Sequence, residues 1–301
     1  MRRIGRRLIV TATSVLAGTV FVGVVATEAA MHVLRRPMAR PELASAVANE
    51  TGATWESVQV TAPDGIALRA WLFTPVNPGA SAVLVMHGIN DARVSMLGHA
   101  RFLLRNGFTV LMPDTRGHGE SGGAIITYGI DEAGDVSRWV DWLLATRHPE
   151  RVYGLGMSLG GAILLQSLAH ERRFDAVVAD SPFSSFREVA YDRLQELTRI
   201  EHHLFWPVVE SGLVYARIRY HRDLRLASPA AALRSCHTPV LLIHGGRDEK
   251  TPIRHSRELH AIDPVMTRLW EVPGVRHTRA LATLPDVYAR TVVDWFHSHG
   301  K

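Results

Sequence analysis

The stretch GMSLGG, residues 156–161, places a serine, Ser158, between glycines in the middle of a chain of 301 residues. An apolar run precedes the serine and a helical pattern follows it. Glycines two positions before and after a serine fit a sharp strand-to-helix turn, because small neighbours avoid clashes in its strained backbone. Such a turn presents the hydroxyl near a helix N-terminus, which favours developing negative charge. The pattern predicts that Ser158 is a nucleophile.

Two other interpretations of this stretch are open from the pattern alone. Dinucleotide-binding loops have the spacing G-x-G-x-x-G, and Gly154 and Gly156 begin that spacing, but Leu159 occupies its third glycine position. The stretch also follows several expected strands instead of the first one. A turn with a purely structural role is the other alternative, and a serine needs a base before it can be more than that.

The base and its acid partner are expected after later strands. Among sixteen histidines, His277 lies in PGVRHTRA, between the last expected strand and the last expected helix. Asp248 ends the run PVLLIHGGRD, and the chain order Ser158, Asp248, His277 is the one expected with a G-x-S-x-G turn. Asp248 could instead cap a helix. Asp180, after an earlier strand, is the rival acid, with a helix cap or a loop contact as its other interpretation.

An acyl-transfer site also needs backbone N–H groups for the oxyanion. The residue after the nucleophile, Leu159, is expected to supply one N–H group, and the loop His87-Gly88-Ile89-Asn90 to supply the other from Ile89. His87 itself is expected to be a structural, hydrogen-bonded residue.

The elements that would position these residues follow a regular alternation. Residues 55–60 and 66–75 alternate in period two around the turn APDG, which predicts a hairpin. After it, apolar strands alternate with helices, which predicts an α/β fold with a mostly parallel sheet covered on both faces. The expected strands cover residues 82–88, 108–117, 151–156, 175–182, 239–248 and 267–274, and the expected helices cover 95–106, 130–147, 159–170 and 285–299.

Residues 183–226 interrupt the alternation with two or three helices that are rich in aromatic residues. We expect them to form a helical cap insertion over the site, although packing between cap and core explains their apolar residues equally well. Phe183 and Phe186 follow a strand end and are the candidate substrate-binding residues.

With these features, the sequence resembles the α/β-hydrolase superfamily over about residues 55–300. VMHGIND resembles its oxyanion loop, DTRGHGESGG the loop after the next strand, GMSLGG its nucleophile elbow, GGRDEKTP its acid loop and GVRH its histidine loop. ADSPF and the apolar N-terminal segment resemble the bacterial serine aminopeptidase-like lipases and esterases. The resemblance implies that Ser158, His277 and Asp248 transfer the acyl group of a small-molecule substrate to water without a cofactor. The apolar run LFWPVVESGLVYA in the predicted cap fits a lipid-like acyl chain.

Other functions remain open at this point. The same catalytic residues would also serve a peptidase or a thioesterase. A membrane-tethered, non-catalytic scaffold with this fold is the non-enzymatic alternative. The histidines at 202–203 and 297–299 lack the spacing of metal ligands.

Charge and cysteine content narrow the partners. The net charge of +5 arises from the first forty residues, which hold seven arginines and one glutamate and leave 27 basic and 28 acidic residues in the rest. A neutral body does not favour nucleic acid as a partner. The single cysteine, Cys236, permits no internal disulfide. The sequence predicts no particular oligomeric state.

The first forty residues form a separate segment before the predicted hydrolase domain, residues 41–301. Residues 8–26 carry no charge and follow the basic start MRRIGRR. As a helix they span roughly 28 Å, close to the thickness of a bilayer core. We expect a transmembrane signal anchor with the catalytic domain outside the cytoplasm. The alternatives are a signal peptide cleaved after Ala26, which gives a secreted protein, and a helix that meets no membrane.

Overall fold

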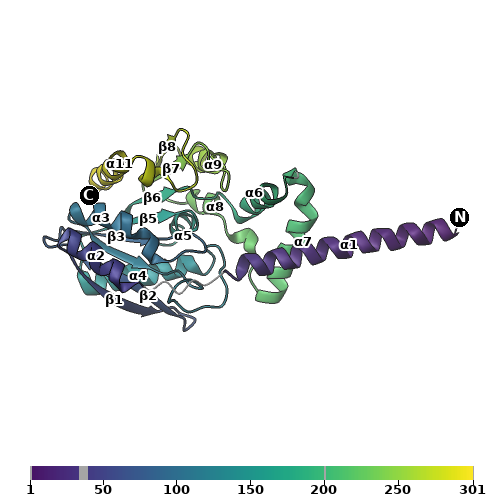
Figure 1. The fold of residues 1–301 in the computed structure, drawn as a ribbon, viewed down its shortest axis with the longest axis horizontal. Coiled ribbons are helices and arrows are strands. Elements are labelled where there is room, and N and C mark those ends of the chain that lie inside the picture. Colours follow the sequence, from purple (N-terminus) through teal and green to yellow (C-terminus); the bar gives the residue numbers. More distant parts are fainter. Residues whose placement is uncertain (1, 34–39, 200, 301) are drawn as a thin grey trace.

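An eight-stranded sheet forms the centre of the computed structural model, which describes residues 2–33, 40–199 and 201–300 (Figure 1). The strand order across the sheet is β1-β2-β4-β3-β5-β6-β7-β8. The strands are β1 (Thr54–Thr61), β2 (Ala67–Thr74), β3 (Ser81–Met86), β4 (Thr109–Pro113), β5 (Arg151–Met157), β6 (Phe174–Asp180), β7 (Val240–Gly245) and β8 (Thr267–Val272).

The predicted hairpin forms the antiparallel edge of this sheet. β1 pairs with β2, with Thr54 opposite Thr74, and β2 pairs antiparallel with β4. The other neighbours are parallel, and every residue of β4 and β7 is buried, as expected where helices cover both faces. The carboxyl ends of the parallel strands therefore lie at one edge, where the loops that follow them meet.

Helices pack on both faces, and side chains of one strand alternate between two cores. In β3, Leu84 belongs to one core and Val83 to the other. The first core is covered by α4 (Glu132–Arg147), α5 (Leu159–Ser167), α8 (Pro229–Leu233) and α9 (Arg254–Ile262). The second is covered by α2 (Pro41–Thr51), α3 (Leu97–Arg105), the short α10 (Ala280–Thr283) and α11 (Pro285–Ser298).

The largest differences between predicted and observed helix boundaries occur in three helices. The helix expected over residues 95–106 is a 3-10 turn, η1 (Arg93–Met96), followed by α3. The helix expected from residue 130 begins at Glu132, because the Glu132 carboxylate accepts hydrogen bonds from the N–H groups of Thr127 and Gly129 and closes a turn before the helix. α5 ends at Ser167 and not at residue 170. Side-chain contacts of this kind have no signature in hydrophobic periodicity.

Residues 183–226 contain two helices and two short 3-10 turns between β6 and β7. They are α6 (Phe186–Thr198), η2 (His202–Phe205), α7 (Trp206–Tyr220) and η3 (Leu224–Leu226). Ser185 caps α6, since its hydroxyl accepts a hydrogen bond from the N–H of Glu188. In Figure 1 these helices lie beside the N-terminal helix, away from the exposed edge of β1.

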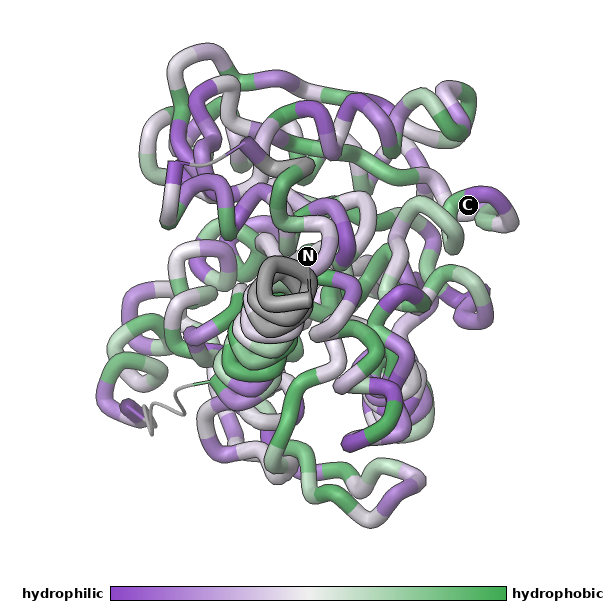
Figure 2. Tube along the Cα trace, turned by 90° about the vertical axis from the view of Figure 1, so that its right-hand side faces the viewer, coloured by the Kyte–Doolittle hydropathy of each residue, from purple (hydrophilic) through white to green (hydrophobic). Residues whose placement is uncertain are grey.

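The N-terminal helix α1 (Arg2–Met31) is longer than the uncharged stretch that predicted it. It projects from the body in Figure 1, and Figure 2 looks along it from the N-terminal end. Residues Thr11–Met31 are long and apolar enough to cross a membrane, and 17% of the most apolar window is buried. The side chains of the flanking arginines at positions 2–7 and the residues at 35–36 lie outside the described part of the chain.

The C-terminal part of α1 packs against α7. Gly23 permits this approach, because a Cβ there would collide with the Ser211 side chain and lie 2.6 Å from the carbonyl oxygen of Val208. Met31 is fully buried, and its carbonyl oxygen accepts a 2.9 Å hydrogen bond from the N–H of Ile126. The body of the protein thus includes the end of α1, upstream of the domain boundary predicted at residue 40.

Candidate active site

Ser158 occupies a tight turn between β5 and α5. Its backbone has φ 51° and ψ −117°, a conformation that is costly for a residue with a side chain. Gly156 and Gly160 make the turn possible. A Cβ on Gly156 would lie 2.5 Å from the backbone of Gly160, and a Cβ on Gly160 would lie 2.5 Å from the carbonyl oxygen of His87. The turn raises the Ser158 hydroxyl above the end of the sheet, at the N-terminus of α5.

The structure brings Ser158, His277 and Asp248 into hydrogen-bond contact. His277 Nδ1 lies 2.6 Å from Asp248 Oδ2, and His277 Nε2 lies 2.9 Å from Ser158 Oγ. Because an ionised carboxylate only accepts, the proton of a neutral imidazole belongs on Nδ1. Nε2 is then the acceptor for the serine hydroxyl. This arrangement allows the imidazole to take a proton from Ser158.

Asp248 is held as a carboxylate from several sides. Burial alone would raise its pKa, but hydrogen bonds from His244 and His277 outweigh burial, and the pKa lies far below its usual range. Its other oxygen, Oδ1, accepts from the N–H groups of Lys250 and Thr251 at 3.0 and 2.9 Å. An acid that stays ionised keeps the imidazole oriented and stabilises its charged form.

His244 is a residue near the acid that sequence reasoning missed. It is fully buried in β7, its Nδ1 lies 2.7 Å from Ser256 Oγ, and its Nε2 lies 2.7 Å from the Thr251 carbonyl oxygen and 3.3 Å from Asp248 Oδ2. The signal was present, because His244 stands four residues before Asp248 in the same strand-end run. Its contacts fix the loop that carries Asp248.

Asp180, the rival acid, lies at the end of β6 beside the Ser158 turn and makes other contacts than Asp248 does. Its carbonyl oxygen accepts the N–H of Ser158 at 2.7 Å, and its carboxylate accepts from the Ser181 hydroxyl at 3.0 Å. Burial raises the pKa of its carboxyl to about 6. No hydrogen bond joins Asp180 to His277 in the described part of the chain, whereas Asp248 contacts that imidazole directly.

Ile89 and Leu159, the predicted oxyanion donors, both border the same cavity as Ser158. Leu159 is the first residue of α5, so its N–H has no partner within the helix. Within residues 40–199 and the other described ranges, the N–H of Ile89 has no acceptor. His87 holds this loop: its Nδ1 lies 2.7 Å from the Gly88 carbonyl oxygen, and its Nε2 accepts the N–H of Thr115. Burial lowers the pKa of His87 and keeps it neutral.

A second histidine supports the oxyanion loop from the loop after β4. His118 Nε2 accepts the N–H of Asn90 at 3.3 Å, and its Nδ1 lies 2.8 Å from Thr115 Oγ1. Burial lowers the pKa of His118 to about 4, so it remains a neutral acceptor. The DTRGHGESGG loop therefore contacts the predicted oxyanion loop through Thr115 and His118.

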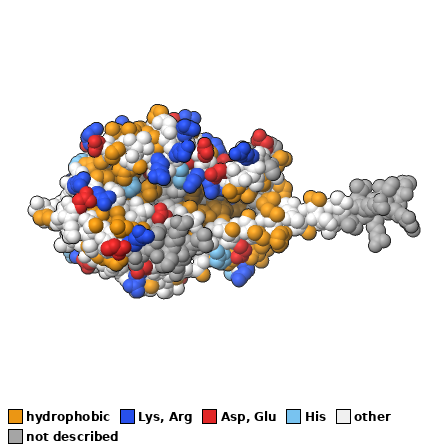
Figure 3. All heavy atoms as spheres, in the orientation of Figure 1, with side chains coloured by type: hydrophobic (Ala, Val, Ile, Leu, Met, Phe, Trp, Pro, Cys, Tyr) orange, Lys and Arg blue, Asp and Glu red, His pale blue; other side chains and the backbone are white. Residues whose placement is uncertain are grey.

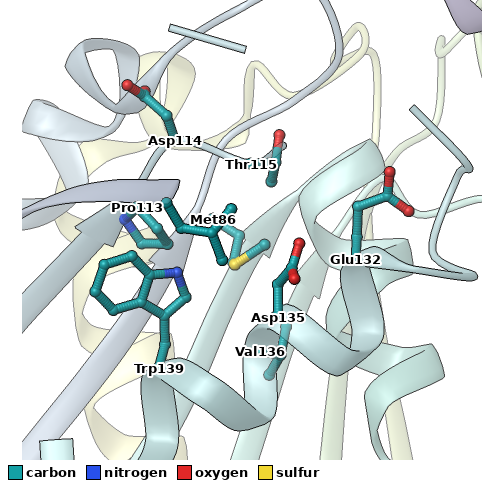
Figure 4. A pocket seen from close by; sticks show the side chains of 9 residues that line it. Met86, Pro113, Asp114, Thr115, Glu132, Asp135, Val136 and Trp139 are labelled. Carbon is teal, nitrogen blue, oxygen red and sulfur yellow. The ribbon is translucent and has the colours of Figure 1, made fainter. Parts of the chain in front are cut away.

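Figure 4 shows a separate small void next to that loop, between β3, β4 and α4. Met86, Asp114, Asp135 and Trp139 line it, and it measures about 10 Å³, room for one water molecule at most. Asp135 pairs with Arg116 through bonds of 2.6 and 2.7 Å. This region is a buried support and not a substrate site.

The cavity at Ser158 is much larger, about 640 Å³, within the range of small-molecule sites. It collects the predicted residues Ser158, His277, Ile89, Leu159, Phe183 and Phe186, with Asp248 behind His277. Phe183 and Phe186 pack around the Tyr128 ring, with centroid distances of 6.5 and 4.4 Å. Residues of α1, α6 and α7 and of the loops around Asp91 and Lys250 form the rest of the cavity wall.

Comparisons with known proteins agree with this architecture. Residues 81–200 match the family model described as the alpha/beta hydrolase fold. The protein Rv2307c of Mycobacterium tuberculosis is 33% identical over 224 residues, which cover 73% of this chain and 71% of that protein. YfhR of Escherichia coli is 28% identical over 255 residues, 81% of each chain.

A solved structure shares the fold at low sequence identity. The esterase Pf2001 of Pyrococcus furiosus superposes with a TM-score of 0.69 at 22% identity and covers 84% of this chain and 96% of its own. At this identity the likeness extends to the fold alone, and the chemistry depends on the residues around Ser158.

Proposed function

This chain belongs to the α/β-hydrolase superfamily, and we propose that it is a serine hydrolase that cleaves carboxylic esters through Ser158, His277 and Asp248. The observation that carries the proposal is the continuous contact from Ser158 Oγ through the His277 ring to Asp248 Oδ2. A serine at a strained turn, a base within reach and an ionised acid are the parts that acyl transfer requires.

The proposed reaction has two halves. Ser158 Oγ attacks the ester carbonyl while His277 Nε2 takes its proton, and the N–H groups of Ile89 and Leu159 hold the oxyanion. His277 then protonates the leaving alcohol, which leaves an acyl group on Ser158. Water, deprotonated by the same imidazole, releases the acid and restores the serine.

The lining of the cavity supports an ester over a peptide. Phe183, Phe186 and apolar side chains of α1, α6 and α7 form most of it, which suits an acyl chain. A peptidase or a thioesterase would use the same catalytic residues and is the alternative chemistry. The occupied Ser158, His277 and Asp248 positions argue against a non-catalytic scaffold, because a scaffold does not need these contacts.

The proposal also places α1 in a membrane, with the body outside the cytoplasm. The apolar span Thr11–Met31 and the arginines before it support this placement. Membranes washed with alkaline carbonate test it: an anchored protein stays with the lipid at full length. Release of the full-length chain, or a secreted form that begins near Thr27, would reject the anchor.

The function is tested by fluorophosphonate labelling of the full-length protein in detergent, with Ser158→Ala beside the wild type. We expect labelling of the wild type alone, followed by Ser158-dependent hydrolysis of 4-methylumbelliferyl butyrate. Equal labelling of the two folded proteins, or none of either, would overturn the assignment of Ser158. A peptidase would instead show Ser158-dependent turnover of peptide amides and little of esters.

A further inference from the structure

The membrane-helix candidate α1 contributes part of the active-site cavity itself. Gly23, Ala26, Thr27 and Ala30 of α1 border the same cavity as Ser158 and His277. Segments more than 120 residues apart in sequence therefore border one cavity. A helix that served only as a tether would have no reason to line the site.

The contact that holds α1 in this wall is specific. Tyr215 and Tyr220 of α7 both donate 2.5 Å hydrogen bonds to the Glu28 carboxylate, and Tyr128 donates to the Ala30 carbonyl oxygen at 2.9 Å. At the helix crossing, a Cβ on Gly212 would lie 3.0 Å from the Gly23 carbonyl oxygen, so the two backbones are close. Glu28 is the one acidic residue in the sequence of the first forty residues, and its carboxylate accepts the hydrogen bonds of both tyrosines.

The facing wall is apolar. It consists of side chains from α6 and α7, namely Val189, Leu194, Leu197, Val208, Val209 and Leu213. The charged residues that border the cavity are Asp91, Arg193 and Lys250. A cavity of about 640 Å³ with this lining has room for an apolar chain between α1 and these helices, and Ser158 borders it.

Exposed apolar side chains continue from this wall to the membrane span. Leu197, Trp206 and Ile218 are 72%, 57% and 71% exposed, and Phe21 and Val25 of α1 are 68% and 49% exposed. Figure 3 shows hydrophobic side chains gathered where α1 enters the body. Twelve residues of the apolar span, Thr11 to Val22, precede its contact with α7 at Gly23, and they rise only about 18 Å along the helix. Because a bilayer core is about 30 Å thick, a membrane around this part of α1 would extend to the adjacent end of α6 and α7.

We propose that the substrate is a long-chain acyl ester that resides in the membrane, and that α1 forms one wall of its acyl-chain site. This inference rests on the ester hydrolysis proposed above. The chain would pass from the bilayer into the space between α1 and the helices α6 and α7, and would lie against Ala26 and Ala30. The ester carbonyl would then meet Ser158, and the polar leaving group would lie toward Lys250.

The test uses the full-length protein in phosphatidylcholine vesicles and compares 4-methylumbelliferyl laurate with the butyrate. Ala26→Phe fills the proposed wall, and Val25→Phe adds the same ring at a neighbouring position that does not border the cavity. We expect Ala26→Phe to lower the laurate-to-butyrate ratio of kcat/KM about tenfold, the effect of excluding about two methylenes. Val25→Phe should keep the ratio of the wild type.

An unchanged ratio in Ala26→Phe, or an equal fall in both variants, would overturn the inference while Ser158-dependent butyrate hydrolysis still supported the proposed function. If the wild type hydrolysed neither ester, the proposed function itself would be contradicted. If Ala26→Phe does not fold, Ala30→Leu narrows the same wall and is judged by the same ratio.

Discussion

Gly23 of α1 and Gly212 of α7 lie against each other at a helix crossing, where a Cβ on Gly212 would meet the Thr27 side chain and the Gly23 carbonyl oxygen. This crossing joins the predicted membrane anchor to the helices over the active site. Both helices border the cavity at Ser158, so a change that separates them is expected to alter that cavity.

Gly212→Ala is predicted to destabilise the protein by about 1–3 kcal/mol, because the added methyl group has no room at the crossing. The matched control is Gly134→Ala in α4, where a Cβ meets nothing within 4 Å. That change should be neutral or stabilising by up to about 1 kcal/mol, since alanine favours a helix over glycine. Thermal unfolding in detergent measures both variants. Equal shifts of the unfolding midpoint would contradict the close contact between α1 and α7 at Gly212.

Asp248→Asn is predicted to lower kcat for a butyrate ester by about 10⁴-fold, because an amide cannot hold His277 in the tautomer that accepts from Ser158. Asp180→Asn is the matched control, since it removes the same charge from a buried acid below the turn. It should cost less than about tenfold, the size of a small positional shift at the site. Steady-state kinetics measure kcat of both variants. A larger loss of kcat in Asp180→Asn would show that Asp180, and not Asp248, is the acid partner of His277.

His99 should make the protein sensitive to acid. It is buried against Phe102 and Tyr288, neither ring nitrogen has a partner in the described residues, and burial lowers its pKa to about 3. In the unfolded chain His99 takes up a proton near pH 6.5, whereas in the folded chain it stays neutral until the pH approaches 3. The free energy of unfolding is therefore highest above pH 6.5 and falls as the pH decreases from 6.5 toward 3.

From pH 8 to pH 5, protonation of His99 in the unfolded chain lowers the free energy of unfolding by about 2 kcal/mol. His99→Leu should remove that part of the acid sensitivity. Urea unfolding at both pH values measures it, with Gly134→Ala as a variant that should keep the dependence of the wild type. A pH dependence unchanged in His99→Leu would show that His99 is not the group concerned.

Removal of residues 1–26, which the alternative of signal cleavage after Ala26 would produce, should lower the midpoint of thermal unfolding and the preference for laurate over butyrate. The deletion takes away Gly23 and Ala26 while it leaves Thr27 to Met31, which still contact the body. Unfolding in detergent and the ester ratio measure the two effects. A shortened protein with the stability and the preference of the intact one would show that the anchor has no part in the site.

Much of the fold follows from local pattern. The period-two runs around APDG form the antiparallel hairpin, and the apolar runs after it form the parallel strands, because side-chain periodicity reports directly on which faces are buried. The turn at Ser158 was predicted from local glycine spacing, since its backbone conformation, φ 51°, depends on the glycines two positions before and after it. His277 and Asp248 could be placed because each follows a strand, and parallel strands end at one edge.

Features that depend on contacts between distant segments had no such signal. His244 reads as one more residue of a buried strand until the fold places it 3.3 Å from the Asp248 carboxylate. The uncharged stretch of α1 indicates a membrane span by its length and composition, but nothing in it indicates that Ala26 borders the cavity of Ser158. The sequence by itself determines strands, helices and the serine turn, because these depend on neighbours along the chain. Only the tertiary structure decides which helix faces cover the site, because that choice depends on packing between segments far apart in the sequence.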